Sequence, residues 1–173
     1  FQLPEGMQHP HTPTHIPLTE ISENQHPVFN GLMQIAPKWT DIEWIIAHTS
    51  LPVILKGIVH PQDAKLALQY GVQGLIISNH GGRVLDTCIS PLTALQLIKK
   101  VVPTDFPLIL DGGIRRGSDV FKAIALGATA VCIGRPYIYG LATAGALGVA
   151  HVLKILKEEF EITMALMGTA TVN

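Results

Sequence analysis

The sequence has 173 residues, of which 47% are hydrophobic and 14% are charged, so it can form one domain with a buried core. Lys and Arg number 12 against 13 Asp and Glu, a balance that excludes a strongly basic surface for nucleic acid or anionic lipid. Cys88 and Cys132 have no metal-binding spacing, so neither a metal site nor a disulfide framework is predicted. This cysteine usage fits a reducing, cytoplasmic compartment.

Residues 1–37 are rich in Pro, His, Thr, Gln and Asn and have no helical or strand period, which predicts a long loop or lid. This segment contains four histidines without an accompanying Cys or carboxylate spacing: His9, His11, His15 and His26. A polar loop is therefore favoured over a metal site. The segment shows no secretory signal, and the missing initiator Met leads us to expect sequence before Phe1.

From residue 38 to residue 173, apolar strands alternate with amphipathic helices. Thr40 and Glu43 have the spacing of a capping box, which predicts a helix start at Thr40. Four continuously apolar strands, of the kind found in parallel sheets covered on both faces, are expected at residues 51–56, 74–79, 106–111 and 130–134. Further helix starts are indicated at Pro61, Ser90-Pro91 and Gly117, and a last helix over residues 144–167.

Repeated strand-helix units predict either a (β/α)8 barrel or an open doubly wound sheet. No G-x-G-x-x-G follows a strand, and polar residues end every strand, which favours the barrel. Four strands supply only half of a barrel, and the two unpaired edges predict a partner half.

Residues 136–153 contain no Asp, Glu, Lys or Arg and have the composition of a membrane span. However, Gly140, Gly145 and Gly148 stand where a lipid-facing helix would carry large apolar residues. We therefore expect a buried turn and helix start here, and no membrane span.

Polar residues with distinct chemistry follow the first two strands. Lys56 ends an apolar strand, where its ammonium needs an anion or an electron-rich ring as a partner. His80 and Arg83 share the glycine-bearing loop after the second strand. The imidazole can take a proton from a hydroxyl, and the guanidinium suits a carboxylate. This pair predicts a site for a small hydroxy or keto acid.

Glycine-rich turns with arginines follow the third and fourth strands, Asp111-Gly112-Gly113-Ile114-Arg115 and Gly134-Arg135. Backbone N–H groups at a helix N-terminus, together with arginine side chains, form a cradle for phosphate. The last two strands of a barrel are the usual phosphate position of that fold. The residues alone predict a phosphorylated, ring-bearing cofactor without naming it.

The chain resembles the second half, strands 5 to 8, of the FMN-dependent 2-hydroxy-acid oxidases and dehydrogenases, a TIM-barrel family that includes glycolate oxidase, lactate oxidase and flavocytochrome b2. The resemblance rests on Leu55-Lys56-Gly57, Ser78-Asn79-His80-Gly81-Gly82-Arg83, Asp111 to Ala123, Gly134-Arg135-Pro136 and Glu159 to Gly168. It implies FMN as the cofactor and a short 2-hydroxy acid, of the glycolate or L-lactate type, as the substrate.

The resemblance also implies roles for individual residues. His80 would be the catalytic base and, with Arg83, would bind the substrate. Lys56 and Ser78 would contact the flavin ring. The ribityl chain and phosphate would be held by Asp111, Gly112, Gly113, Ile114, Arg115, Gly134 and Arg135. The family further implies an N-terminal half-barrel, a homo-oligomer of four subunits, and a peroxisomal location for eukaryotic glycolate-oxidase types.

The chain departs from the family pattern in two places. The segment from Thr87 to Thr93 differs from the family's usual sequence, which affects local packing. The family's pocket tyrosines and the Asp that pairs with the catalytic His belong to its first half and have no counterpart here. Two alternatives therefore stay open: a non-catalytic half-barrel or flavin-binding module, and an aldolase or isomerase that uses Lys56 as a Schiff-base amine.

Overall fold

The computed structural model describes residues 24–172 and divides into two compact units, Phe1–Asp41 and Ile42–Asn173. In the first unit, a π-helical turn, η1 (Pro27–Gly31), precedes a 3-10 turn, η2 (Leu32–Gln34). The backbone N–H of His26 donates to Oδ1 of Asn30 over 2.9 Å. The expected loop thus contains two short helical turns, and the other three histidines of this segment lie outside the described residues.

The first α-helix, α1 (Trp39–Ala47), begins one residue earlier than the capping-box pattern predicts. Its first turn is capped by Asp41, whose Oδ2 accepts the backbone N–H of Lys38 over 2.6 Å. The predicted short helix is therefore found, but its capping residues are Lys38 and Asp41 and not Thr40 and Glu43. The Asp41 carboxylate stands three residues after Lys38, the spacing at which it can accept an orphan donor at the helix end.

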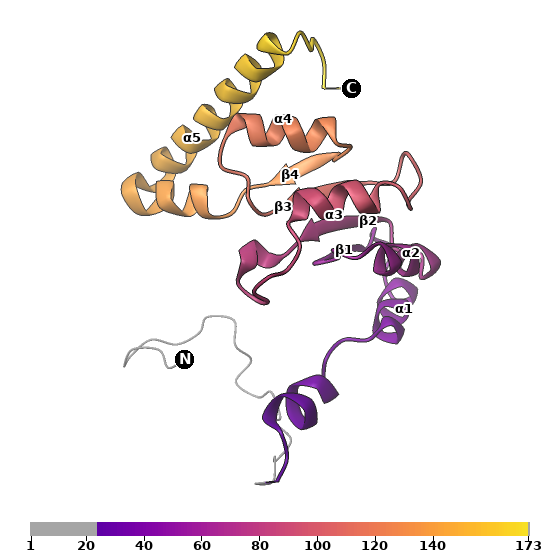
Figure 1. Cartoon of the computed structure of the whole chain (residues 1–173). Coiled ribbons are helices and arrows are strands. Elements are labelled where there is room, and N and C mark those ends of the chain that lie inside the picture. Colours follow the sequence, from indigo (N-terminus) through magenta and orange to yellow (C-terminus); the bar gives the residue numbers. More distant parts are fainter. Residues whose placement is uncertain (1–23, 173) are drawn as a thin grey trace. The chain divides into compact units, whose positions relative to one another are not determined.

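Four parallel strands form the sheet of the second unit: β1 (Ile54–Lys56), β2 (Gly74–Ser78), β3 (Leu108–Asp111) and β4 (Ala130–Cys132). They lie side by side in chain order, β1-β2-β3-β4 (Figure 1). The predicted parallel α/β arrangement is confirmed, and each strand lies within its expected range. Parallel neighbours need a crossover, and each is supplied by a helix.

The crossover helices are α2 (Pro61–Gln69), α3 (Pro91–Ile98) and α4 (Gly117–Ala125). Each starts at the residue that the sequence indicates. Ser90 caps α3 because its Oγ accepts the N–H of Thr93 over 3.2 Å. Proline occupies the first position of α2 and α3, where its missing N–H costs no helical bond.

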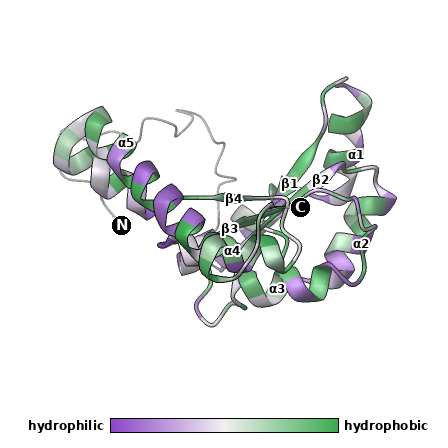
Figure 2. Cartoon of the chain, turned by 90° about the horizontal axis from the view of Figure 1, so that it is seen from above, coloured by the Kyte–Doolittle hydropathy of each residue, from purple (hydrophilic) through white to green (hydrophobic). Residues whose placement is uncertain are grey.

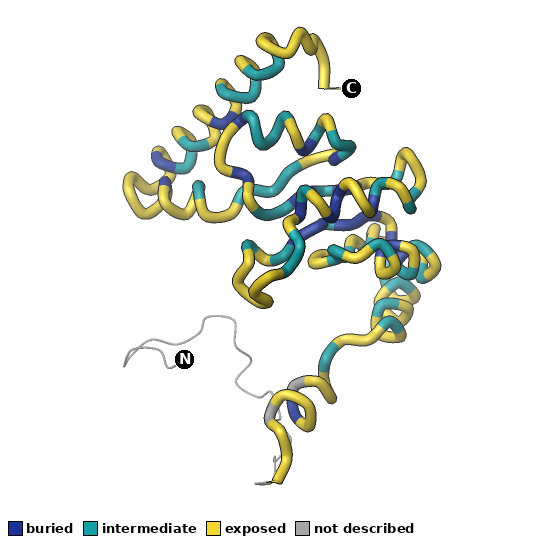
Figure 3. Tube along the Cα trace, viewed as in Figure 1, coloured by how far each residue is buried: buried dark blue, intermediate teal, exposed yellow. Residues whose placement is uncertain are grey.

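The core lies between the sheet and its helices, and the buried residues gather on β2, β3 and α3 (Figure 3). Figure 2 shows hydrophobic residues along the strands. Six large side chains are fully buried: Leu75, Ile77, Leu95, Ile98, Leu108 and Leu110. In the strands these residues alternate with Ile76 and Ile109, which are only half-buried and belong to the opposite face of the sheet.

Strand register places four chemically distinct residues on that opposite face. Ser78 pairs with Asp111, and Asp111 pairs with Cys132. Lys56 pairs with Ile76, two residues before Ser78 and therefore on the same face. The sheet thus carries its polar groups at the carboxyl ends of its strands.

The last helix, α5 (Arg135–Leu166), consists of two segments that meet at a break. Helical geometry is lost at Ala144 and at Gly145, whose φ of 58° and ψ of −141° suit only glycine. A Cβ placed on Gly148 would lie 1.9 Å from the carbonyl oxygen of Gly140, so the two segments touch backbone to backbone. The glycines of this segment therefore serve a turn between packed helices.

By length and composition, α5 is the one helix in residues 24–172 that could cross a membrane. The break at Gly145 interrupts it within the apolar stretch. The helix expected from about residue 144 is found. Residues 135–143 are also helical, so the predicted turn is confined to the break at Ala144 and Gly145. The expected burial is not observed within this chain, since Leu141 is 49% and Leu147 80% exposed.

Candidate active site

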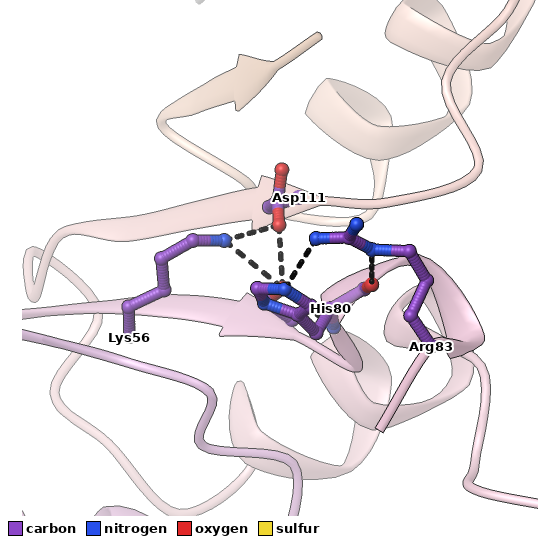
Figure 4. Close-up of polar contacts among 5 residues, drawn as sticks. Lys56, His80, Arg83 and Asp111 are labelled. Carbon is purple, nitrogen blue, oxygen red and sulfur yellow. Dashed lines mark hydrogen bonds and ion pairs between the residues drawn. The ribbon is translucent and has the colours of Figure 1, made fainter. Parts of the chain in front are cut away.

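Lys56, Ser78 and Asp111 form a hydrogen-bonded group across three neighbouring strands. The Lys56 ammonium donates to the Asp111 carboxylate and, over 3.1 Å, to Oγ of Ser78. Ser78 donates its own hydroxyl proton to the same oxygen of Asp111. Figure 4 shows Lys56 and Asp111 pointing toward each other beside His80. The anion that the strand-end lysine was expected to need is thus Asp111 in this structure.

The carboxyl of Asp111 is ionised at neutral pH. Burial raises the pKa of Asp111, but the hydrogen bonds from Lys56 and Ser78 and the charge of Lys56 lower it by more. The net result is a pKa below the ordinary value of 3.8. Lys56 and Asp111 therefore form a charged pair that opens onto the strand ends.

His80 and Arg83 contact each other within the loop after β2, where His80–Gly82 form a 3-10 turn, η3. Nη2 of Arg83 lies 2.6 Å from Nε2 of His80 (Figure 4). A guanidinium can only donate, so Nε2 of His80 accepts this hydrogen bond through its lone pair. This is the form of the imidazole that can take a proton from a ligand. The two residues, which the sequence places on one loop, are thus in contact with each other.

Arg135, at the start of α5, reaches the same loop. Its Nη2 donates to the carbonyl oxygen of Gly81 over 3.4 Å. The residue before it, Gly134, caps α5 without a side-chain hydrogen bond. Because the first N–H groups of a helix need an acceptor, this helix end is suited to an anion.

The N-terminus of α4 differs from the predicted phosphate cradle. Oδ2 of Asp119 accepts the N–H groups of Arg115 and Arg116 over 3.1 and 3.0 Å. Oε2 of Glu159, on α5, accepts the N–H of Gly117 over 2.8 Å. These backbone donors are thus already bound by carboxylates. A ligand can therefore contact the side chain of Arg115 and the turn before it, but not the N–H groups at the start of α4.

One pocket of about 440 Å³ opens at the carboxyl ends of the strands. It brings together ten of the eleven residues that the sequence singled out: Lys56, His80, Arg83, Asp111, Gly112, Gly113, Ile114, Arg115, Gly134 and Arg135. The eleventh, Ser78, is only 3% exposed and does not line the pocket. The clustering expected from strand ends is therefore observed, with Ser78 behind the wall.

The pocket also contains residues that sequence reasoning missed. Cys132 lines the pocket because it pairs with Asp111 in the sheet and stands on the same face. The pairing of the two strand ends was the signal that could have identified it. Burial and then the charge of Asp111 raise the pKa of the Cys132 thiol above 9.0, so it forms a neutral wall. Tyr137 and Ile138, in the first turn of α5, line the pocket as well. Their position directly after Gly134-Arg135 was the available signal.

Among the described residues, no group of three or more His, Cys, Asp or Glu side chains is arranged to hold a metal ion. The cationic groups of the pocket instead suit an anionic organic ligand: Lys56, Arg83, Arg115 and Arg135. The carboxyl ends of parallel strands are the usual position of the ligand site in α/β proteins, and this pocket places the chain in that class.

The chain belongs to the FMN-dependent dehydrogenase family, whose sequence pattern matches residues 2–173. It is 56% identical over 135 residues to a 2-hydroxyacid oxidase of Dictyostelium discoideum, covering 78% of this chain and 35% of that protein. It is 50% identical over 146 residues to an L-lactate oxidase of Alicycliphilus denitrificans, covering 84% of this chain and 40% of that protein. The predicted family is confirmed.

Two further comparisons agree. A peroxisomal (S)-2-hydroxyacid oxidase of Arabidopsis thaliana is 55% identical over 135 residues, covering 78% of this chain and 37% of that protein. A solved mandelate oxidase variant with a monooxide FMN adduct superposes with a TM-score of 0.75 at 45% identity, covering 79% of this chain and 43% of the other. The chain thus spans about two fifths of the relatives that it matches.

Proposed function

We propose that this chain supplies the second half, strands 5 to 8, of a (β/α)8 barrel, with residues 1–37 as the segment after strand 4 and residues 38–173 as the half-barrel. The order β1-β2-β3-β4 is parallel and sequential, as in a barrel. The chain spans only 35% and 40% of two relatives, so most of a barrel's other strands would come from another segment. An N-terminal half-barrel, on the same or a separate chain, would pair with the edge strands β1 and β4.

The residues of the pocket fit FMN. Its phosphate would bind to Arg115, Arg135 and the open N-terminus of α5. Asp111 and the glycines after it would hold the ribityl chain. Lys56 would place its positive charge at the edge of the flavin ring. Both glycines after Asp111 have positive φ, of 103° and 81°, a conformation that favours glycine. Because glycine has no side chain, a ligand can approach the backbone closely here.

The proposed reaction is the oxidation of a short 2-hydroxy acid, of the glycolate or L-lactate type, to the 2-keto acid. When bound, FMN would accept the two electrons and the hydrogen that C2 loses. The Arg83 guanidinium would bind the substrate carboxylate, and Nε2 of His80 would take the proton of the 2-hydroxyl. Because Arg83 donates to Nε2 in this structure, a carboxylate that draws Arg83 away also frees the base.

The observation that carries this proposal is the meeting of His80 and Arg83 in one pocket with Lys56, Arg115 and Arg135. The relatives' names agree with the substrate class, since they include 2-hydroxyacid, L-lactate and glycolate oxidases. By the same resemblance we propose a homotetramer, located in the cytoplasm or, as for the Arabidopsis relative, in peroxisomes.

The test is anaerobic addition of L-lactate or glycolate to the complete FMN-loaded assembly. The visible absorption of the flavin is expected to bleach, because two electrons move to it. Lactamide, which keeps the hydroxyl but lacks the carboxylate, is the matched control and is expected to react at least about a hundredfold less efficiently. Bound flavin that no 2-hydroxy acid bleaches would contradict the proposal and would favour a non-catalytic flavin-binding half-barrel.

A further inference from the structure

The turn before α4 carries two consecutive arginines whose surroundings differ. Arg115 lines the pocket at the carboxyl ends of the strands. Arg116 does not line that pocket, and its Nη1 lies 3.6 Å from Oε1 of Glu159 on α5. Either guanidinium could bind a phosphate by its chemistry alone. The ion pair with Glu159 is therefore what distinguishes the second arginine from the first.

The same carboxylate also holds the backbone of this turn. Oε2 of Glu159 accepts the N–H of Gly117 over 2.8 Å. The N–H groups of Arg115 and Arg116 are bound by Asp119, which belongs to α4 itself. Of these three hydrogen bonds, the one to Glu159 joins the turn to another element. The backbones of α4 and α5 come close enough for it because Gly117 has no side chain, and a Cβ there would overlap α5 (Figure 1).

Helix α5 therefore affects both arginines of the pocket. Arg135 is its first residue, and Glu159 lies in its second segment, beyond the break at Gly145. Arg115 and Arg135 line one pocket and carry like charges, so they repel each other until an anion binds between them. Ordering a mobile side chain on binding weakens the affinity for the ligand. A turn that is fixed before the ligand arrives reduces this loss.

We propose that Glu159 is a positioning residue for the phosphate of the cofactor: its carboxylate fixes the turn before α4 against α5, so that Arg115 faces the pocket and Arg116 is kept out of it. Glu159 does not line the pocket, so it acts through Arg115. This inference rests on the proposed function, since it takes Arg115 and Arg135 as the residues that bind the FMN phosphate. Charge alone predicts the opposite effect, because a carboxylate near the site repels a phosphate.

The experiment measures two dissociation constants in the complete assembly freed of flavin, that of FMN and that of riboflavin, which lacks the phosphate. Quenching of flavin fluorescence reports both, after circular dichroism has established that each variant folds. Glu159→Ala is expected to weaken FMN binding about 10-fold and to leave riboflavin affinity within about twofold of wild type. Glu159→Gln removes the same charge but keeps an oxygen that can accept the Gly117 N–H, so FMN binding should weaken by less than about threefold.

A double variant tests whether Glu159 acts through Arg115. Arg115→Ala should weaken the binding of FMN and not that of riboflavin, because it removes a contact to the phosphate. Glu159→Ala added to it should weaken FMN binding no further, since residues that act as one unit are not additive. Glu158→Ala is the matched control, because the neighbouring Glu158 forms an exposed ion pair with Lys154 outside the pocket. It should change neither dissociation constant.

Two results would overturn the inference. Equal weakening of FMN and riboflavin binding by Glu159→Ala would mean that Glu159 only supports the fold, and unchanged or tighter FMN binding would mean that it does not position Arg115. If Glu159→Ala does not fold, Glu159→Asp withdraws the carboxylate by one methylene and is judged in the same way, with an expected loss for FMN of about threefold.

The proposed function can fail separately. If Arg115→Ala leaves the preference for FMN over riboflavin unchanged, the proposed phosphate site is wrong, and the inference falls with it. If bound FMN is not reduced by any 2-hydroxy acid, the proposed reaction is wrong. The two dissociation constants are measured without substrate, so they still decide the role of Glu159 in that case.

Discussion

At the scale of single residues, Lys56 at the end of β1 forms an ion pair with Asp111 at the end of β3. Both groups stand on the sheet face without crossover helices, and their attraction lowers the pKa of Asp111 despite its burial. The Lys56 side chain is 47% exposed, so solvent screens the pair. Its contribution to stability is therefore modest and depends on pH.

Asp111→Asn is expected to lower the free energy of unfolding at pH 7 by about 1 kcal/mol. The pKa of Asp111 is lower in the folded protein than in the unfolded chain, so the carboxylate stabilises the fold above pH 3.8. As pH falls below 3.8 toward the folded pKa, wild-type protein takes up the proton and the difference between the two proteins should shrink. Urea unfolding over a pH series measures this.

Glu158→Gln is the control for that series. Oε1 of Glu158 lies 3.6 Å from Nζ of Lys154 in an exposed ion pair on α5. The substitution should therefore change the free energy of unfolding by less than about 0.5 kcal/mol. A difference between wild type and Asp111→Asn that grows on acidification would mean that the sign of the Asp111 pKa shift is wrong.

The sequence predicted most of the site at this scale, for a physical reason. Parallel strands end at one edge of a sheet, so residues that follow successive strands must meet there. His80, Arg83 and Lys56 were found in this way. The occupation of the α4 N-terminus by Asp119 and Glu159 was not predictable, because Glu159 lies 42 residues away from the Gly117 N–H that it binds.

At the scale of elements, the contact between α4 and α5 depends on Gly117. A Cβ at this position would lie 2.1 Å from the backbone nitrogen of Phe160 and 2.5 Å from the carbonyl carbon of Glu159. These are backbone atoms of a long helix and cannot rotate away. Phe121 and Phe160 extend the contact, with ring centroids 6.5 Å apart. The glycine is therefore needed for close approach of the two helices.

Gly117→Ala should destabilise the protein by about 2 kcal/mol or more, because α5 must shift to admit the methyl group. The sign is the informative part, since Gly→Ala within a helix ordinarily stabilises by about 0.5–1 kcal/mol. Thermal or urea unfolding measures it. Ser118→Ala, one residue further along α4, is the control and should stay within about 0.5 kcal/mol of wild type. A Gly117→Ala variant as stable as wild type would show that the helices do not pack this closely.

Element positions followed from the sequence where one signal dominated. The apolar runs of β1 to β4 and the prolines at the starts of α2 and α3 gave the right places. The sequence was less informative for α5, because glycines predict a break but not that helix continues on both sides of it. The helical segment before the break packs on the segment after it through Gly140 and Gly148, a tertiary contact that local propensity cannot express.

At the scale of the whole molecule, the second unit presents an open sheet with β1 and β4 at its edges. Several large apolar side chains of this unit are strongly exposed, among them Leu51 at 73% and Leu147 at 80%. Edges and apolar surface of this kind are normally covered in proteins. The chain also spans only about two fifths of its relatives. Both observations support the proposal that an N-terminal half-barrel pairs with this one.

The most direct measurement of the central claim is the rate of anaerobic flavin reduction against L-lactate concentration in the complete assembly, for wild type, His80→Asn and Arg83→Lys. His80→Asn should bind FMN normally and lower the saturating rate about 10²- to 10⁴-fold, as expected for loss of a general base. Arg83→Lys should mainly raise the lactate concentration needed for half the maximal rate, because a lysine loses the bidentate bond to the carboxylate. Wild-type reduction rates and lactate dependence in both variants would contradict the account.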